Sequence, residues 1–484
     1  MIGDSLHAFL GFSDTWLPRI AVTALISTLL CFVIAIFVTA TVRRNKAKKF
    51  WGPLRRSRSK KAKGIILGRI PGRLVFLPTG AEGHVACFGG SGSGKTSALV
   101  IPTLRSWDGT ALVIDISGDI ERKIPTFNKA VIAPYGDSTH KFDVLYFVDN
   151  ANDLGEQNER LQALSFTLIP SKPTTDDTAA FYQEESRKLL QSALVAYYHA
   201  GLDFVQICKQ VLKSTAEFLL EDINASGNEL ALDLAAGFEG GNEKTLSATK
   251  QEVDKAIMLF ATNDKVAAVV GRGGISPATL ENKSIFLNIP DEKLELLAPL
   301  LRLVTSQTFE YLSARAEDKN SPILLCLDEF VSFGKMDILP ALRKLRKRWV
   351  NVMILTQSLA DLDLIYGIPE RRAMLDNIKY KLVLEANEFD TQKYFSDLSG
   401  EKIVIRASRT DNPSNGGSFT ETEQTEKLIK PEQLAPGELE NYLYLFYPGG
   451  VGVMKLKKNF YYEKHGVRSF LSQMVDERFL RKSR

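Results

Sequence analysis

The sequence predicts an α/β fold in which helices cover both faces of a buried, largely parallel sheet. Short, almost continuous apolar runs alternate with helical patterns after residue 64. One of these runs leads into a glycine-rich segment, and another ends in two adjacent carboxylates. Continuous apolar runs are typical of strands that are buried on both faces, and their alternation with helices indicates a parallel sheet.

The N-terminal region comes first in the chain, and its composition predicts a membrane anchor. Residues 20–42 carry no charge and as a helix would span about 34 Å, enough to cross a hydrocarbon core of about 30 Å. Residues 43–63 carry eleven Lys and Arg and no acidic residue, which places the C-terminal side in the cytoplasm. We expect a short periplasmic N-terminus (1–19), one transmembrane helix (20–42) and a basic juxtamembrane segment (43–63). A buried core helix is the alternative for residues 20–42.

The net charge of +4 is concentrated in this N-terminal region. Residues 1–63 hold twelve basic and two acidic residues, whereas the rest of the chain holds 49 basic and 55 acidic residues, a net charge of −6. Any contact between the rest of the chain and nucleic acid must therefore come from local clusters of Lys and Arg. The four cysteines form no C-x-x-C pair, which argues against a disulfide framework or a cysteine zinc site.

The glycine-rich segment at residues 89–96 reads Gly-Gly-Ser-Gly-Ser-Gly-Lys-Thr and fits the phosphate-binding P-loop. An apolar strand pattern (His84–Phe88) precedes it and a helical pattern (Ser97–Arg105) follows. Glycines let backbone N–H groups curl around phosphate, and Lys95 would reach the β- and γ-phosphates of ATP while the Thr96 hydroxyl would bind Mg²⁺. A plain glycine-rich turn is the alternative. The expected nucleotide-binding residues are Gly89, Gly90, Ser91, Gly92, Ser93, Gly94, Lys95, Thr96 and Ser97.

Two later strand ends carry further candidate catalytic residues. The apolar run Ile323–Leu327 ends in Asp328 and Glu329, the pattern of a Walker B strand. Asp328 would hold the Mg²⁺ shell, and Glu329 would orient or deprotonate the attacking water. Gln357 follows the run Val350–Leu355 and could sense the γ-phosphate, because an amide donates and accepts at once. For each strand end, simple capping of the backbone is the alternative. Further strands are expected at Ala111–Asp115, Ala130–Ala133, Ile285–Ile289 and Lys381–Leu384.

A strongly basic helix is predicted between the Walker B strand and Gln357. Its apolar stripe would be Ile338, Leu342, Leu345 and Trp349. Its opposite face would carry Arg343, Lys344, Arg346, Lys347 and Arg348. A solvated face is the simplest interpretation, but the proximity of the helix to the catalytic residues favours contact with another subunit or with DNA.

Four helical patterns between the first strands and the Walker B strand predict an all-α insertion. They cover Phe181–Tyr198, Val205–Glu221, Glu229–Ala236 and Glu243–Thr262. We place the insertion at 203–264, within a nucleotide-binding domain of residues 64–202 and 265–470, followed by a C-terminal tail (471–484). Asp411–Glu426 is polar and lacks periodicity, so a surface loop or disorder is expected there.

Together these motifs make the chain resemble the type IV coupling proteins, the TraG/TraD family of conjugation and type IV secretion ATPases. The resemblance rests on Gly89–Pro102, Ile114–Asp119, Leu327–Phe330 with Gly334–Met336, and Thr356–Leu359 with Ile365–Gly367. It implies a RecA-like core with an all-helical insertion, tethered to the membrane and assembled as a homo-hexamer. The family usually has two transmembrane helices, whereas this sequence shows one.

The resemblance also implies a function. The protein would be an inner-membrane ATPase that depends on ATP and Mg²⁺. It would recruit single-stranded DNA, a relaxase complex or secreted proteins and deliver them to a type IV secretion channel. The alternatives are a double-stranded DNA pump of the FtsK/HerA type and a membrane receptor that uses ATP only as a switch. RecA-like motors place ATP between neighbours and donate an arginine in trans. Our candidates are Arg346 and Arg348, with Arg372 as the alternative.

Overall fold

The structure is a computed structural model that describes residues 51–463 except 52, 59–61, 117, 125–127, 171–175, 241, 318, 320, 337, 411–417 and 449–451. It divides into a small unit (residues 1–54 and 449–452) and a large unit (55–448 and 453–484). The predicted transmembrane helix (20–42), the N-terminus, most of the basic segment and the C-terminal tail lie outside the described residues. In the described part of the chain, every helix is too short or too polar to span a bilayer.

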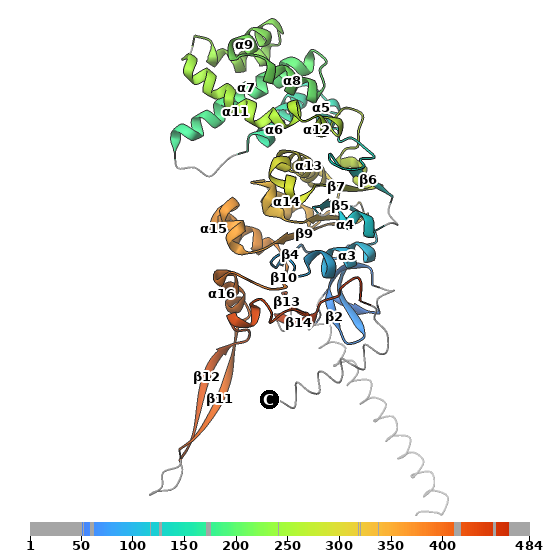
Figure 1. Cartoon of the computed structure of the whole chain (residues 1–484), viewed down its shortest axis with the longest axis vertical. Helices are drawn as coiled ribbons and strands as arrows, with labels where there is room; N and C mark the ends of the chain where they lie inside the picture. The colour runs from blue at the N-terminus through green and yellow to red at the C-terminus, as the bar shows by residue number, and fades with distance from the viewer. Residues whose placement is uncertain are drawn as a thin grey trace, which may run out of the picture. The chain divides into compact units, whose positions relative to one another are not determined.

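A single twelve-stranded sheet forms the centre of the large unit among the described residues (Figure 1). Its strand order is β1-β3-β2-β14-β13-β10-β4-β9-β8-β5-β7-β6. The strands are β1 (Arg55–Ser57), β2 (Gly64–Ile70), β3 (Arg73–Pro78), β4 (Val85–Phe88), β5 (Thr110–Asp115), β6 (Lys129–Ile132), β7 (Ser284–Asn288), β8 (Ile323–Leu327), β9 (Val350–Thr356), β10 (Tyr380–Val383), β13 (Tyr442–Phe446) and β14 (Val453–Lys457).

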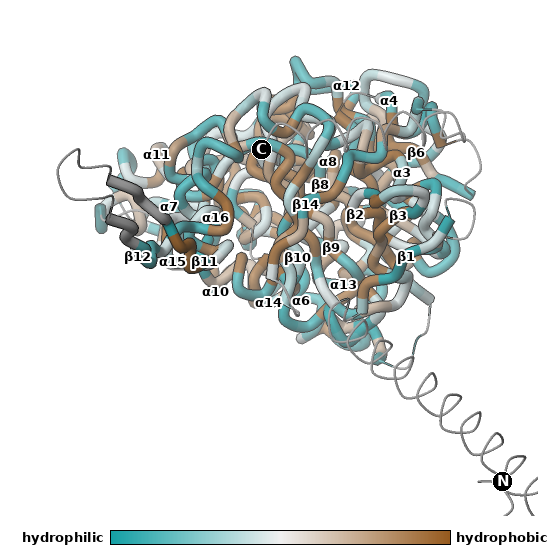
Figure 2. The backbone as a smooth tube through the Cα atoms, turned by 90° about the horizontal axis from the view of Figure 1, so that it is seen from below, coloured by the Kyte–Doolittle hydropathy of each residue, from teal (hydrophilic) through white to brown (hydrophobic). Residues whose placement is uncertain are grey.

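The seven strands from β10 to β6 run parallel, which confirms the predicted parallel sheet. Each predicted strand lies within one residue of the observed one at either end. β4, β8 and β9 are buried along their whole length, and Figure 2 shows brown, apolar chain in the central strands with teal, polar chain around them. Because the strands are parallel, their carboxyl ends meet at one edge, where the P-loop and Walker B residues follow β4 and β8.

The other five strands extend this sheet in antiparallel fashion, and the sequence patterns did not predict them. β13 pairs with β10 and β14, while β2 pairs with β14 and β3, and β1 pairs with β3. β2 and β13 are apolar runs like those of the parallel strands. Because no helical pattern separates either of them from the next strand, the alternation of strand and helix that indicates a parallel sheet is missing there. The residue after β14, Lys458, reaches the segment that follows β4, where its ammonium donates to Ser93 O.

Helices make up the rest of the large unit. They are α3 (Ile101–Ser106), α4 (Asp119–Lys123), α5 (Tyr146–Asp149), α6 (Leu154–Leu168), α7 (Asp177–His199), α8 (Phe204–Lys213), α9 (Ala216–Ala225), α10 (Glu229–Ala235), α11 (Glu243–Thr262), α12 (Asp264–Ala268), α13 (Leu294–Ala314), α14 (Ile338–Leu345), α15 (Leu359–Asn377) and α16 (Phe389–Leu398). In Figure 1, α3 and α4 lie on one side of β9 and β5, and α14 and α15 lie on the other.

A helical layer consists of α6 to α12, with α7 packed against α6, α8, α10 and α11. The predicted insertion at 203–264 covers α8 to α11, and its boundaries stay a proposal. Every helix of the layer starts at a side chain that accepts a hydrogen bond from the first turn. These caps are Asp153, Asp176, Asp203, Thr215, Asn228, Asn242 and Asn263. Such caps stabilise a helix by about 1 kcal/mol each.

Three details of the predicted secondary structure are wrong. The helix expected at Val205–Glu221 is two helices, because the Thr215 cap starts α9 anew after α8 ends. α14 ends at Leu345, so Trp349 is outside the apolar stripe; it has a φ of 59° and its ring packs on Gly80. A left-handed residue there turns the chain directly into β9.

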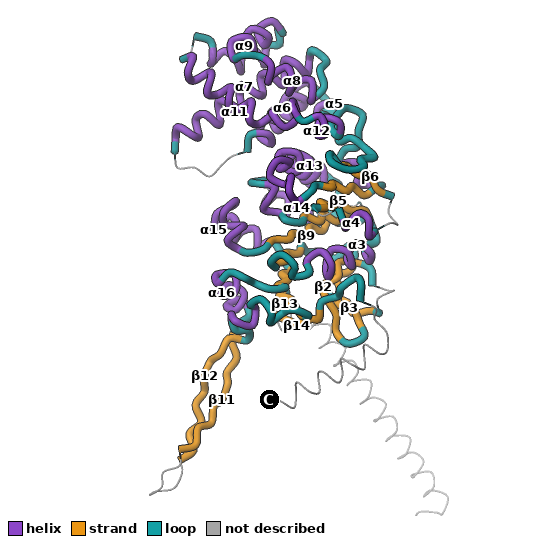
Figure 3. The backbone as a smooth tube through the Cα atoms, viewed as in Figure 1, coloured by secondary structure: helices purple, strands orange, loops and turns teal. Residues whose placement is uncertain are grey.

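The third error concerns the polar segment expected as a loop. β11 (Glu401–Thr410) pairs antiparallel with β12 (Ser418–Lys427) in a two-stranded hairpin, which extends away from α16 in Figure 3. Apart from Phe419, every residue of β12 is polar, and its described side chains are exposed or only partly buried. The period-two signal of a half-buried strand is therefore missing.

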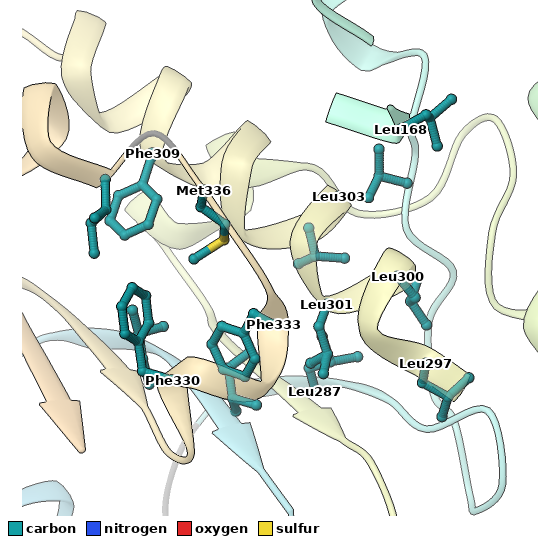
Figure 4. Close-up of a cluster of buried hydrophobic side chains, with 14 of the residues drawn as sticks. Leu168, Leu287, Leu297, Leu300, Leu301, Leu303, Phe309, Phe330, Phe333 and Met336 are labelled. Carbon is teal, nitrogen blue, oxygen red and sulfur yellow. The ribbon is translucent and has the colours of Figure 1, made fainter. Parts of the chain in front are cut away.

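The core between α13 and the Walker B region fixes the catalytic strand end. α13 packs against the 3-10 helix η6 (Phe330–Phe333), which follows Glu329. Leu301 and Phe333 are among the buried side chains of this core (Figure 4). Phe330 and Phe333 are fully buried. The segment directly after the candidate catalytic glutamate is thus anchored by large apolar side chains.

Candidate nucleotide-binding site

The P-loop connects the carboxyl end of β4 to a helix whose N-terminus has no side-chain cap. That helix begins as the π-helix η2 (Lys95–Val100) and continues as α3. Gly94, just before it, has a φ of 97°, which is a left-handed conformation that favours glycine. Gly89 N donates to Thr356 O at 3.1 Å, so the loop is tied to the end of β9. An uncapped helix N-terminus presents backbone N–H groups to an anion.

Three glycines of the loop leave no room for a side chain. A Cβ at Gly89 would lie 2.5 Å from Ser93 Oγ, and one at Gly90 would lie 2.7 Å from Asn387 Nδ2. A Cβ at Gly94 would lie 2.9 Å from Phe460. The Ser93 hydroxyl is buried without a hydrogen-bond partner in the described structure. The loop therefore has the tight backbone curvature and the spare polar groups of a phosphate cradle.

Lys95 lies inside this loop. Its ammonium donates to the carbonyl oxygens of Gly89 at 2.7 Å and Gly90 at 3.4 Å. The same ammonium is 3.4 Å from a carboxylate oxygen of Glu329. Only 7% of Lys95 is exposed, so the charge is held at the point where the P-loop pattern places phosphate.

Asp328 and Thr96 form the candidate metal site. Thr96 Oγ1 donates to Asp328 Oδ2 across 3.4 Å. Burial, followed by the nearby Glu329 carboxylate, raises the pKa of Asp328 to about 6. A hydroxyl and a carboxylate are the hard oxygen donors that Mg²⁺ prefers, and a divalent cation would offset the cost of the buried charge. These two residues therefore fit a Mg²⁺ ion.

Glu329 and Gln357 meet because β8 and β9 are neighbours. Gln357 Nε2 donates to Glu329 Oε2 at 3.5 Å. Glu329 has a φ of 48°, a strained conformation for a residue with a side chain, and such strain concentrates at functional sites. Gln357 itself is exposed. The structure thus brings together Lys95, Thr96, Asp328, Glu329 and Gln357 at the carboxyl edge of the parallel sheet.

The structure does not bring the candidate arginines to this edge. Arg346 pairs with Glu82 at 3.1 Å and is more than half exposed. It lies just before β9 starts, whereas Gln357 follows its end, and a seven-residue strand is about 23 Å long. Arg348 contacts Glu317 at 3.6 Å near the same position. Arg372 is exposed on α15. Arg346 therefore cannot act on the site of its own chain.

The family was identified by comparison with known proteins. Residues 53–483 match the family described as Type IV secretory system Conjugative DNA transfer. The chain belongs to this family. It is similar to Protein VirD4 of Rhizobium radiobacter, with 24% identity over 449 residues, covering 86% of this chain and 63% of the relative. The chain thus spans less than two thirds of that relative.

Solved structures of coupling proteins share this fold. Unbound TrwBdeltaN70, a bacterial conjugative coupling protein, gives a TM-score of 0.67 at 20% identity and covers 87% of this chain and 95% of its own. The plasmid coupling protein TrwB in complex with ADP and Mg²⁺ gives a TM-score of 0.66 at 19% identity, covering 84% and 91%. The likeness confirms an α/β fold with a large, mostly parallel sheet.

Three residues at the site escaped the sequence patterns. Lys458, directly after β14, is 1% exposed, and its ammonium donates to Ser93 O of the P-loop at 2.6 Å. Phe460 lies under Gly94, and Tyr461 N donates to Ser97 O at 3.0 Å. No local motif marks this segment, because the antiparallel pairing of β14 alone brings it to the P-loop.

Proposed function

We propose that this chain binds ATP at the P-loop and hydrolyses it. The observation that carries the proposal is the convergence of Lys95, Thr96, Asp328, Glu329 and Gln357 at the ends of three adjacent parallel strands. The crowded glycines and the uncapped helix support a phosphate ligand. The complex of TrwB with ADP and Mg²⁺, a protein of the same fold, supports the same ligand here.

The geometry suggests a role for each residue. Lys95 moves from the loop carbonyls to the β- and γ-phosphates when ATP binds. Glu329, which loses its contact with Lys95 in that movement, accepts a hydrogen bond from the attacking water. The water oxygen then attacks the γ-phosphorus and gives its proton to the Glu329 carboxylate, while the bond to the bridging oxygen breaks and its electron pair leaves with ADP. Gln357 donates to the γ-phosphate. Mg²⁺ held by Thr96 and Asp328 would neutralise charge on the phosphates.

We infer that hydrolysis drives the delivery of DNA or a DNA–relaxase complex, or alternatively secreted proteins, to a type IV secretion channel at the inner membrane. The family description, which joins secretion with conjugative DNA transfer, supports this inference. Residues 20–42 would anchor the chain, and the basic residues 43–63 would keep the nucleotide site in the cytoplasm.

The proposed assembly is a homo-hexamer with ATP bound between neighbours. Arg346 is exposed and far from its own P-loop, so it can contribute only to a neighbour's site. An arginine supplied in trans would stabilise charge on the γ-phosphate. Arg372, which is also exposed, is the alternative, and Arg348 is less suited because its guanidinium is largely buried beside Glu317.

The test is the ATPase activity of the purified full-length chain at increasing protein concentration, with and without a single-stranded oligonucleotide. We expect activity to rise more than linearly with concentration and to increase with single-stranded DNA. Mixing Arg346→Ala chains with Lys95→Ala chains should recover activity, because one mixed interface carries both intact halves. A wild-type chain that does not hydrolyse ATP would contradict the proposed ATPase activity. Stimulation by duplex DNA alone would favour a double-stranded DNA pump.

A further inference from the structure

A cleft of about 860 Å³ lies away from the nucleotide site, between α6 and α7 on one side and α13 and α14 on the other. We call it the α13 cleft. Its lining includes four cationic side chains and two carboxylates. The cations are Arg187, Arg302, Lys335 and Lys344, and the carboxylates are Glu310 and Glu370.

Arg302 is the central cation of the cleft. Its guanidinium donates from Nε to Thr167 O at 3.0 Å and from Nη2 to Leu168 O at 3.5 Å. Arg187 and Lys335 pair with carboxylates at 2.6 and 2.9 Å, whereas no carboxylate among the described residues pairs with Arg302 or Lys344. Burial lowers the pKa of Arg302. Arg302 is partly buried, and no described carboxylate offsets its charge, so an anion in the cleft would pair favourably with it.

The floor of the α13 cleft touches both segments that carry the candidate catalytic residues. A Cβ on Gly334 would lie 3.4 Å from Arg302 Nη1, so the guanidinium lies against the backbone that follows η6 and Glu329. Lys335 pairs with Glu370 at 2.9 Å, and Glu370 belongs to α15, the helix that follows Gln357. The Lys335–Glu370 pair therefore joins the two catalytic segments inside the cleft.

We propose that the α13 cleft binds the phosphodiester backbone of single-stranded DNA, with phosphates on Arg302 and Lys344. Phe166, at the cleft, is 41% exposed and has the Arg187 guanidinium 4.5 Å from its ring centre. An aromatic ring and cations side by side are what single-strand sites use for bases and phosphates. A phosphate that also reaches Lys335 would replace Glu370 as its partner, which links DNA binding to the catalytic segments. The inference rests on the proposed function, because it specifies where the DNA substrate binds.

The test is the affinity of the full-length chain for a labelled single-stranded oligonucleotide, measured by fluorescence anisotropy over a range of salt concentrations. Lys344→Ala and Arg302→Met should each raise Kd about tenfold and reduce the salt slope by about 0.7, the value of one phosphate contact on a single strand. Lys209→Ala is the matched control, since Lys209 is an exposed lysine of α8 that does not line the cleft. It should bind as the wild type does.

Glu370→Gln tests the proposal by an expected gain of affinity for the oligonucleotide. A misfolded variant would lose affinity, so misfolding cannot produce this result. The substitution removes the carboxylate that competes with phosphate for Lys335, so affinity for the oligonucleotide should increase several-fold. Wild-type affinity in Lys344→Ala and Glu370→Gln would overturn the proposal. Equal competition by dTMP alone would also overturn it, because the cleft would then take a free nucleotide. ATPase activity that persists in either case would leave the proposed enzyme intact.

Discussion

The helices of the helical layer and the two helices that follow the P-loop and the Walker B strand satisfy their first backbone N–H groups in opposite ways. Each helix from α6 to α12 starts at an Asp, Asn or Thr whose side chain satisfies backbone N–H groups. At the sheet edge, the helix after Gly94 and η6 after Glu329 start without any side-chain cap. The residues before them have φ values of 97° and 48°.

This difference shows where the chain gives up local stability for binding. In a capped helix, the cap side chain accepts hydrogen bonds from the first N–H groups, so these groups do not bind a ligand. The uncapped P-loop helix leaves those donors for a phosphate, and the strained Glu329 backbone directs a carboxylate toward Lys95. Violations of local rules are therefore informative when they gather at one edge of a sheet.

The largest expected effect comes from the two charged residues that meet at the uncapped edge. Lys95→Ala should abolish ATP binding and turnover. Glu329→Gln should lower turnover by about 10²–10⁴-fold while ATP still binds, because Asp328 and Thr96 remain. Rapid-mix turnover and equilibrium binding of a fluorescent ATP analogue measure the two separately. Wild-type turnover in Glu329→Gln would remove that residue from the reaction.

The opposite edge of the sheet offers the next test, because the buried imidazole of His84 has a hydrogen-bond partner for each of its ring nitrogens. His84 Nε2 donates to Leu342 O at 2.8 Å and Nδ1 accepts from Val352 N at 3.1 Å. Burial lowers the pKa of His84 to about 4, below the ordinary value of about 6.5. The unfolded chain therefore binds a proton first as pH falls, and stability present above pH 6.5 is lost toward pH 4.

The expected loss is about 1.4 kcal/mol per pH unit, or about 3 kcal/mol in all. Urea unfolding of the full-length chain at pH 7, 5.5 and 4.5 measures it. His84→Gln should be less stable at pH 7 but should show a shallower decline with acid. A decline of equal slope in both proteins would show that other groups cause it.

Two left-handed glycines sharpen the comparison directly. Gly94 at the site has a φ of 97° and Phe460 behind it, whereas Gly201 after α7 has a φ of 85° and open space around it. Gly94→Ala should weaken ATP binding at least about tenfold through the contact with Phe460. Gly201→Ala should cost about 1–2 kcal/mol of stability and leave ATP affinity unchanged. Equal effects of the two changes on ATP affinity would mean that backbone strain alone, and not the site, is responsible.

The smallest expected effect is the loss of one cap in the helical layer. Asn228 accepts from Ala231 N at the start of α10, so Asn228→Ala should lower the free energy of unfolding by about 1 kcal/mol. ATP affinity should stay at the wild-type value, as judged by the same binding assay. A change in ATP affinity would show that the layer and the nucleotide site are coupled more tightly than their separate caps suggest.

The sequence was most informative where chemistry and local pattern coincide. Continuous apolar runs located the parallel strands within one residue, because a strand buried on both faces has no polar positions to confuse the pattern. The spacing of Lys95 and Thr96, and of Asp328 and Glu329, identified the residues that the structure brings together. The family assignment was confirmed by the match over residues 53–483.

Contacts between distant segments were not predictable from the same patterns. Lys458 touches Ser93 only because β14 joins the sheet antiparallel, and Arg302 meets Gly334 only through the packing of α13. The hairpin β11–β12 was missed because its exposed strands have no buried face. Trp349 was placed on a helix because its spacing fits one, although its backbone turns the chain.

The contact between Lys458 and Ser93 has a consequence for the order in which the protein is made. The two residues are 365 positions apart, and a ribosome adds about 5–20 residues per second. The P-loop therefore leaves the ribosome about 20–70 s before the lysine that supports it from behind. During that interval the nascent chain contains the full Gly-Lys-Thr motif but lacks the hydrogen bond from Lys458 to Ser93 O. ATP binding at full strength becomes a property of the finished chain, and a prematurely terminated one would lack it.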